Sequence, residues 1–190
     1  VYPFPFMMFV KQCVMKTVLN TLPTIDDNKN KINAAFWAGG LYTHKHALDG
    51  HYIDRQKIYN EISNRIVSKS LNHTEYMEHL KKYKICVDLI GVGNPNKRTF
   101  EILFSNSLLM SMCTDLDWGF NGNLGFSSAL NPDLGPWDPD TLFTTSEEFK
   151  FKLNKLLTDN DHYKKCLDKQ NQIISKYFNK KWMKEYKSWY

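Results

Sequence analysis

The stretch KICVDLIGVGNPNKRTFEILFSNSLLM, from Lys84 to Met110, decides the fold. Its first residues, KICVDLIG, are rich in β-forming side chains and predict a strand. After a glycine loop, NKRTFEILFSN predicts a helix with Phe100, Leu103 and Phe104 on one face, and SLLMSMC predicts the next buried strand. A strand, a helix and a second strand in immediate succession form the repeating unit of a parallel sheet.

The same alternation continues on both sides of this stretch. AAFWAGG predicts a short buried strand that ends in a Gly-Gly turn, and RIVSKS predicts another short strand. YIDRQKIYNEIS and TEYMEHLKKY predict helices, the second capped by Thr74. TSEEFKFKLNKLL predicts a helix capped by Thr145 or Ser146, and residues 162–190 predict one long helix or two. We therefore expect an α/β fold with a Rossmann-like parallel sheet covered by helices on both faces.

Length and composition favour one packed domain. The chain has 190 residues, of which 42% are hydrophobic, enough to bury a sizeable core. We expect a single α/β domain over 1–190, with an apolar N-terminal segment (1–24), a Rossmann-like core (25–160) and C-terminal helices (161–190). The chain opens without an initiator Met, so we expect it to be part of a longer protein.

Charge and cysteine usage narrow the classes of partner and compartment. The net charge of +5 suits an anionic ligand, but the cations are not clustered as in nucleic-acid-binding proteins, so no nucleic-acid partner is expected. The sequence lacks the roughly 18 consecutive apolar residues of a transmembrane segment. Four cysteines stand far apart, which favours a reducing compartment such as the cytoplasm over the alternative of the secretory lumen. The lysine and asparagine bias is typical of an AT-rich genome, such as that of a large DNA virus or a protist.

Two glycine turns fall where ligands bind in parallel sheets. Gly39-Gly40 and Gly91-Val92-Gly93 each follow a predicted strand, at the edge where the loops lead into helices. The dinucleotide fingerprint is incomplete here, because Asn96 stands where its third glycine belongs. The P-loop is incomplete as well, because it requires Gly-Lys-Ser/Thr and the chain has Asn96-Lys97-Arg98-Thr99.

The cations after the second turn point to an anion. Lys97 and Arg98 lie in the first turn of a predicted helix, where cations oppose the helix dipole unless an anion lies in front of them. A diphosphate would be such an anion, and Glu101 would then accept hydrogen bonds from ribose hydroxyls. The alternative is that Lys97 pairs with Glu101 at i, i+4 and Arg98 is solvated.

The chain resembles a known family in three blocks. IDDNKNKINAAFWAGG, DRQKIYNEIS and YKICVDLIGVGNPNKRTFEILFSNSLLM look like the core of a Rumi-like protein O-glycosyltransferase and, more widely, the donor half of a GT-B glycosyltransferase, over about Ile25 to Tyr177. By this resemblance Arg98 matches the arginine that binds the diphosphate. Gly91 and Gly93 match the close-approach loop, and Gly39-Gly40 the first phosphate turn. The family usually has arginine before this turn, where the chain has Ala38.

The resemblance implies a glycosyltransferase that transfers a sugar from a UDP- or GDP-linked donor to a hydroxyl on a protein or glycan, with no metal or other cofactor required. The donor-binding residues would be Gly39, Gly40, His44, Arg55, Gly91, Gly93, Asn94, Lys97, Arg98 and Glu101, with His44 or Arg55 replacing the missing arginine. In GT-B enzymes the general base often lies in the other lobe, a further expected partner. Within this chain the candidate bases are Asp49, Asp54 and His46.

Other readings of the sequence remain open. Asp115-Leu116-Asp117 follows an apolar strand, as does the D-x-D that holds Mn²⁺ in GT-A glycosyltransferases, and one of these aspartates could instead bind the ribose in a dinucleotide-dependent oxidoreductase. The His-rich run THKHALDGHYID could hold a metal, contact the donor or acceptor, or be a polar loop. A binding module inactivated through Ala38 is a further alternative.

Overall fold

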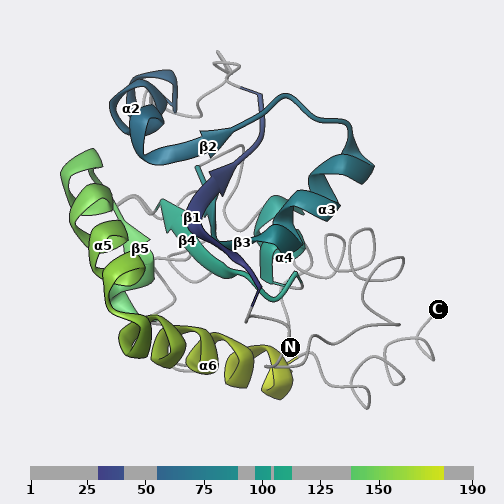
Figure 1. Ribbon diagram of the computed structural model, residues 1–190, viewed down its shortest axis with the longest axis vertical. Helices are drawn as coiled ribbons and strands as arrows, with labels where there is room; N and C mark the ends of the chain where they lie inside the picture. The colour runs from purple at the N-terminus through teal and green to yellow at the C-terminus, as the bar shows by residue number, and fades with distance from the viewer. Residues whose placement is uncertain (1–29, 41–54, 90–96, 104, 113–137, 178–190) are drawn as a thin grey trace, which may run out of the picture.

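The computed structural model describes residues 30–40, 55–89, 97–103, 105–112 and 138–177 (Figure 1). Within these ranges the strands are β1 (Ile32–Trp37), β2 (Ile66–Ser68), β3 (Tyr83–Asp88), β4 (Leu108–Met112) and β5 (Leu142–Phe143). The α-helices are α2 (Arg55–Ile62), α3 (His73–Lys82), α4 (Lys97–Leu103), α5 (Ser146–Thr158) and α6 (Asn160–Tyr177), and two short 3-10 helices are η3 (Ser63–Arg65) and η5 (Pro139–Thr141).

The described strands form one five-stranded sheet in the order β2-β1-β3-β4-β5, and every neighbouring pair is parallel. Phe36 lies opposite Cys86, and Cys86 lies opposite Leu109, so the apolar middles of the three central strands are in register. The α/β fold with a parallel sheet, expected from the alternation of strands and helices, is confirmed.

Helices cover both faces of this sheet, as the sequence predicts. Ala35 and Trp37 belong to a buried cluster that includes Phe149 of α5 and Leu167 of α6. Phe36 points the other way, with its ring stacked 4.9 Å from that of Tyr83 and close to the rings of α3. In Figure 1, α3 and α4 accordingly lie on one side of the strands, and α2 and α5 on the other.

The cap of α3 lies two residues before the one that the sequence predicts. Asn72, not Thr74, is the N-cap: its side chain accepts a hydrogen bond from the Glu75 N–H at 3.0 Å. The Glu75 carboxylate in turn accepts from the Asn72 N–H at 3.0 Å. This reciprocal box needs an acid three residues after the cap. Thr74 has Met77 there, so it cannot form one.

The start of α5 agrees with the sequence prediction. Thr145, one of the two predicted caps, accepts a hydrogen bond from the Glu148 N–H at 3.2 Å. Glu148 reaches back to the N–H and hydroxyl of Thr144, both at 2.8 Å, and these bonds lower the pKa of its carboxyl to about 2.

The sequence did not predict β5 and η5. Both lie at or just after the end of a stretch rich in Pro, Gly and Asp, and β5 has two residues, too few for any periodicity. Parallel pairing with Ser111 and Met112 of β4 makes it a strand.

A buried glutamine fastens α6 to the amino end of β4. Gln170 is 2% exposed; its side-chain oxygen accepts from the Leu109 N–H at 2.9 Å, and its nitrogen donates to the Ser107 carbonyl at 2.8 Å. The hydrogen-bond partner of these two backbone groups is therefore a side chain and not the backbone of a neighbouring strand. We refer to this contact as the Gln170 clasp.

Candidate functional site

The strand order makes a topological switch point between the carboxyl ends of β1 and β3. The chain goes from β1 to β2 on one side and then to β3 on the other, so the connections diverge at this point. In open parallel sheets, ligands bind beyond the carboxyl ends of the strands at such a switch point. The predicted site residues Gly39 and Arg98 follow these two strands in the sequence.

The structure brings Gly39 and Arg98 into contact. A Cβ atom added to Gly39 would lie 2.3 Å from Nη2, 2.7 Å from Cζ and 3.0 Å from Nη1 of Arg98. Any other side chain at this position would therefore have to push the guanidinium away. Gly39 thus allows the close approach of the arginine of α4, and the phosphate contact predicted for this turn stays a prediction.

Asp88 and Trp37 hold the Arg98 guanidinium from the protein side. Asp88, at the end of β3, is 1% exposed, and its Oδ1 lies 3.9 Å from Nη1 of Arg98. Thr99 donates its hydroxyl to the other carboxylate oxygen. The Arg98 guanidinium also lies 5.9 Å from the centre of the Trp37 ring, within the range of a cation–π contact. The side chain of Arg98 remains 22% exposed, so it is oriented by buried groups while still accessible to a ligand.

Two buried polar groups, on Trp37 and Tyr76, lie near the ion pair of Asp88 and Arg98. Among the described residues, neither the Tyr76 hydroxyl nor the Trp37 Nε1 has a hydrogen-bond partner. Burial raises the pKa of Tyr76 far above its usual value; the charge of Arg98 opposes the rise, and those of Glu101 and Asp88 add to it. The hydroxyl therefore stays protonated and can donate. The sequence did not mark four of these residues as part of a site, because the sequence around each is as typical of a buried core as of a binding site: Asp88, Thr99, Trp37 and Tyr76.

Glu101 faces α3. It is 9% exposed, and its Oε1 lies 3.8 Å from Nε2 of His73, the first residue of α3. It stands three residues after Arg98 on α4, so the two residues are neighbours on the surface of that helix. The predicted contact with ribose stays a prediction.

The other predicted site residues are only partly covered by the described ranges. Gly40 follows Gly39 and is exposed. Arg55 and Lys97 are the first residues of α2 and α4, and their side chains are not described. Outside the described residues lie His44, His46, Asp49, Asp54, Gly91, Gly93, Asn94, Asp115 and Asp117. Their roles stay predictions.

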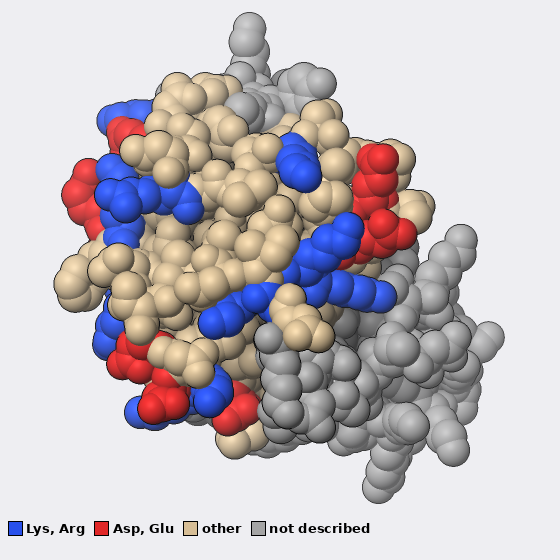
Figure 2. All heavy atoms as spheres, viewed as in Figure 1, with Lys and Arg blue, Asp and Glu red and all other residues tan. Residues whose placement is uncertain are grey.

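The charges in view do not form one large field. Figure 2 shows a surface that is mostly neutral, with one band of Lys and Arg near the middle and mixed groups of both signs toward the margins. A nucleic-acid-binding face would be expected to be lined more continuously with cations. Within the described part of the chain, no helix has both the length and the apolar character needed to cross a membrane.

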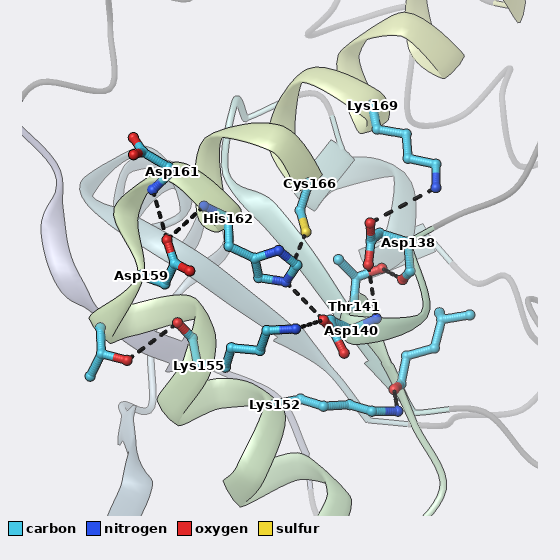
Figure 3. A network of polar contacts seen from close by, with 12 residues as sticks. Asp138, Asp140, Thr141, Lys152, Lys155, Asp159, Asp161, His162, Cys166 and Lys169 are labelled. Atoms are coloured by element: carbon cyan, nitrogen blue, oxygen red, sulfur yellow. Dashed lines mark hydrogen bonds and ion pairs between the residues drawn. The ribbon is translucent and has the colours of Figure 1, made fainter.

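A second polar cluster lies at the opposite edge of the sheet. Asp138 and Asp140 precede β5, so they lie at the amino ends of the strands, where His162 and Cys166 of α6 meet them (Figure 3). The sequence analysis singled out none of these four residues for a site. The i, i+4 spacing of His162 and Cys166 was a signal that could have marked them.

No protein-family model matches the chain, and no curated protein matches it. The features established for this protein are thus its α/β fold, its all-parallel sheet and the two clusters of polar side chains at opposite edges of that sheet.

Proposed function

We propose that this chain is the donor-binding domain of a GT-B-type glycosyltransferase, which binds a nucleotide diphosphate sugar and transfers the sugar to a hydroxyl. The observation that carries the proposal is the position of Arg98, whose guanidinium lies over Gly39 in the turn that follows β1, beside the switch point between β1 and β3. Open parallel sheets typically bind nucleotides beyond the carboxyl ends of the strands at such a switch point. The three sequence blocks that resemble the GT-B family supply the substrate class.

The chemistry required of the site is stabilisation of a leaving diphosphate. The acceptor oxygen attacks the anomeric carbon, the bond from that carbon to the phosphate oxygen breaks, and the diphosphate departs with the electron pair. Forked N–H donors of Arg98 would bind that charge bidentately. A general base takes the acceptor proton; Asp49, Asp54 and His46 are the candidates within this chain.

The position of Arg98 also bears on the residue that departs from the family pattern. Ala38 stands where the family usually has arginine, and the proposal must account for the lost cation. Arg98 reaches across to the turn that follows β1, so a guanidinium lies beside that turn although none precedes it in the sequence. The buried Asp88 partly neutralises this charge, so we expect moderate affinity for the diphosphate.

Thermal unfolding with nucleotides tests the proposal. UDP or GDP at a hundred times its dissociation constant should add about 2.7 kcal/mol to the free energy of unfolding, whereas the matching monophosphate and NAD should add less. Stabilisation by NAD alone would instead support a dinucleotide-binding oxidoreductase.

Arg98 variants show whether the nucleotide binds at this site. Arg98→Lys keeps a cation near Asp88 but loses the forked donors, so we expect a nearly normal Tm and roughly tenfold weaker nucleoside diphosphate binding. Arg98→Ala should abolish binding and lower the Tm, since Asp88 is left buried without its cation. The double variant Asp88→Asn/Arg98→Ala should recover the Tm but not the binding. Normal binding by both single Arg98 variants would rule this site out.

A further inference from the structure

The cluster at the amino edge of the sheet brings three types of metal ligand together. Asp138, His162 and Cys166 each offer one ligand atom, and these atoms lie within 4.8 Å of one another. Asp138 caps η5, whereas His162 and Cys166 stand one turn apart on α6 and point toward it (Figure 3). The site is largely enclosed: Asp138 is 12% exposed, His162 15% and Cys166 2%.

The geometry excludes a Cys-His-Asp nucleophile. In such a triad the thiol and the carboxylate contact different nitrogens of the imidazole. Here the Cys166 sulfur at 3.7 Å and the Asp140 Oδ2 at 2.8 Å both approach Nε2 of His162.

We propose that Asp138, His162 and Cys166 bind a zinc-like transition-metal ion. One thiolate, one imidazole and one carboxylate is a donor set suited to Zn²⁺ or Co²⁺ and unsuited to Mg²⁺ or Ca²⁺. Zinc bonds of about 2.0 Å to nitrogen or oxygen and about 2.3 Å to sulfur put tetrahedral ligand atoms about 3.3–3.6 Å apart. The 3.7 Å between Cys166 Sγ and His162 Nε2 matches such an edge.

Asp140 can act as a fourth ligand, and two lysines have to move away from their aspartates when the ion binds. Asp140 Oδ2, next to Nε2 of His162, can supply the fourth ligand once it leaves the Lys155 ammonium, 2.7 Å away. Lys169 lies 3.9 Å from Asp138 in the same way. Both lysines are partly exposed, 44% for Lys155 and 33% for Lys169, so each ammonium can turn into water as the metal replaces it.

The bound ion would fasten the edge of the sheet. β5 has two residues and, among the described strands, pairs with β4 alone, so this pairing holds it weakly. A metal shared by Asp138 and the two α6 ligands would connect the segment entering β5 to the helix that crosses the amino edge. This is a structural role, and it lies at the edge opposite Arg98.

Cobalt absorption tests the site in the full chain. After treatment with a chelator, Co²⁺ should produce the visible bands of tetrahedral cobalt and the near-ultraviolet charge-transfer band of a cobalt thiolate, and Zn²⁺ should remove them. Cys166→Ser should lose the charge-transfer band, and His162→Gln should weaken Co²⁺ binding beyond the roughly 10–100-fold typical of losing an outer-sphere partner. The control Cys86→Ala, a buried thiol on β3, should keep both bands.

Lys155→Ala separates a metal site from a hydrogen-bonded network. Lys155 competes with the ion for Asp140, so its removal should raise Co²⁺ affinity while lowering the Tm of the metal-free chain. The proposal is overturned if the folded wild type gives no cobalt–thiolate band. It is equally overturned if the band survives Cys166→Ser, or if Lys155→Ala weakens Co²⁺ binding.

Discussion

At the scale of single residues, the ion pair between Asp88 and Arg98 joins a stability requirement to a binding requirement. Asp88 is buried at the end of β3 and needs the cation, whereas Arg98 is accessible enough to bind a second anion. Breaking a buried pair by removing one partner typically costs about 3–5 kcal/mol, and the 3.9 Å separation together with the Thr99 hydroxyl should make the cost here smaller. Experiments on Arg98 must therefore separate folding from binding.

Gly39→Ala achieves that separation. The new Cβ would collide with the end of the Arg98 side chain, which can rotate, so the Tm should fall less than in Arg98→Ala because the cation is still present. The displaced guanidinium would then be misplaced for a diphosphate, and we expect nucleoside diphosphate affinity to fall about tenfold or more. Calorimetric titration with UDP and GDP measures this. Equal affinities for Gly39→Ala and the wild type would show that Arg98 at this turn does not bind the nucleotide.

At the scale of elements, the sequence predicted four of the five described strands and all five described α-helices. Three of those strands, β1, β3 and β4, are largely apolar runs of five or six residues, and local composition is enough to identify them. β5 is a strand through its pairing with β4, and the cap of α3 depends on which residue has an acid three positions later. Both are decided by specific partners that a hydrophobic pattern does not reveal.

The cap of α3 is directly testable. Asn72→Ala removes the acceptor for the Glu75 N–H, and we expect a loss of about 1 kcal/mol in the free energy of unfolding. For a chain of this size, that corresponds to about 2–4 °C in Tm. The matched control is Thr74→Ala, which should change the Tm by much less because Thr74 is not the cap. A larger loss for Thr74→Ala would contradict the capping assignment.

The amino end of α5 should be sensitive to acid. The hydrogen bonds from Thr144 hold the pKa of Glu148 at about 2, below its ordinary value of 4.5. A lowered pKa in the folded state stabilises the protein above pH 4.5, and this contribution disappears as the pH falls toward 2. Since Glu148 is 42% exposed, we expect the contribution to be about 1 kcal/mol at most.

Glu148→Gln should therefore lower stability at pH 7 and have no effect near pH 2, as measured by urea unfolding across this range. Lys152→Met removes the ion-pair partner at 3.3 Å but leaves Thr144, so it should keep most of the pH dependence. A pH-independent effect of Glu148→Gln would contradict this account.

At the scale of the whole molecule, the two polar clusters lie at opposite edges of one sheet. Arg98 is at the carboxyl edge, and Asp138, His162 and Cys166 are at the amino edge. The first could be inferred from the sequence, because parallel strands bring the turns after β1 and β3 to the same edge. The second could be inferred only in part: the i, i+4 spacing puts His162 and Cys166 on one face of a helix, but their meeting with Asp138 depends on how that helix crosses the sheet.

Since the two edges are separate, removal of metal should leave nucleotide binding intact. We expect EDTA to lower the Tm of the zinc-loaded chain while the affinity for UDP or GDP changes less than about twofold. Isothermal titration with and without EDTA measures this. Loss of nucleotide binding with EDTA, and its absence in Asp117→Ala, would instead support the D-x-D alternative.

The Gln170 clasp has a consequence for how the chain folds as it is made. The hydrogen-bond acceptor of the Leu109 N–H is the side chain of Gln170, which follows 61 residues later in the sequence. At synthesis rates of about 5–20 residues per second, the start of β4 lacks this partner for roughly 3–12 seconds. We expect ribosome-bound chains that end before Gln170 to be cleaved readily by protease and those that extend past α6 to resist it. Equal protease resistance of the shorter and longer chains would mean that the nascent domain folds without α6.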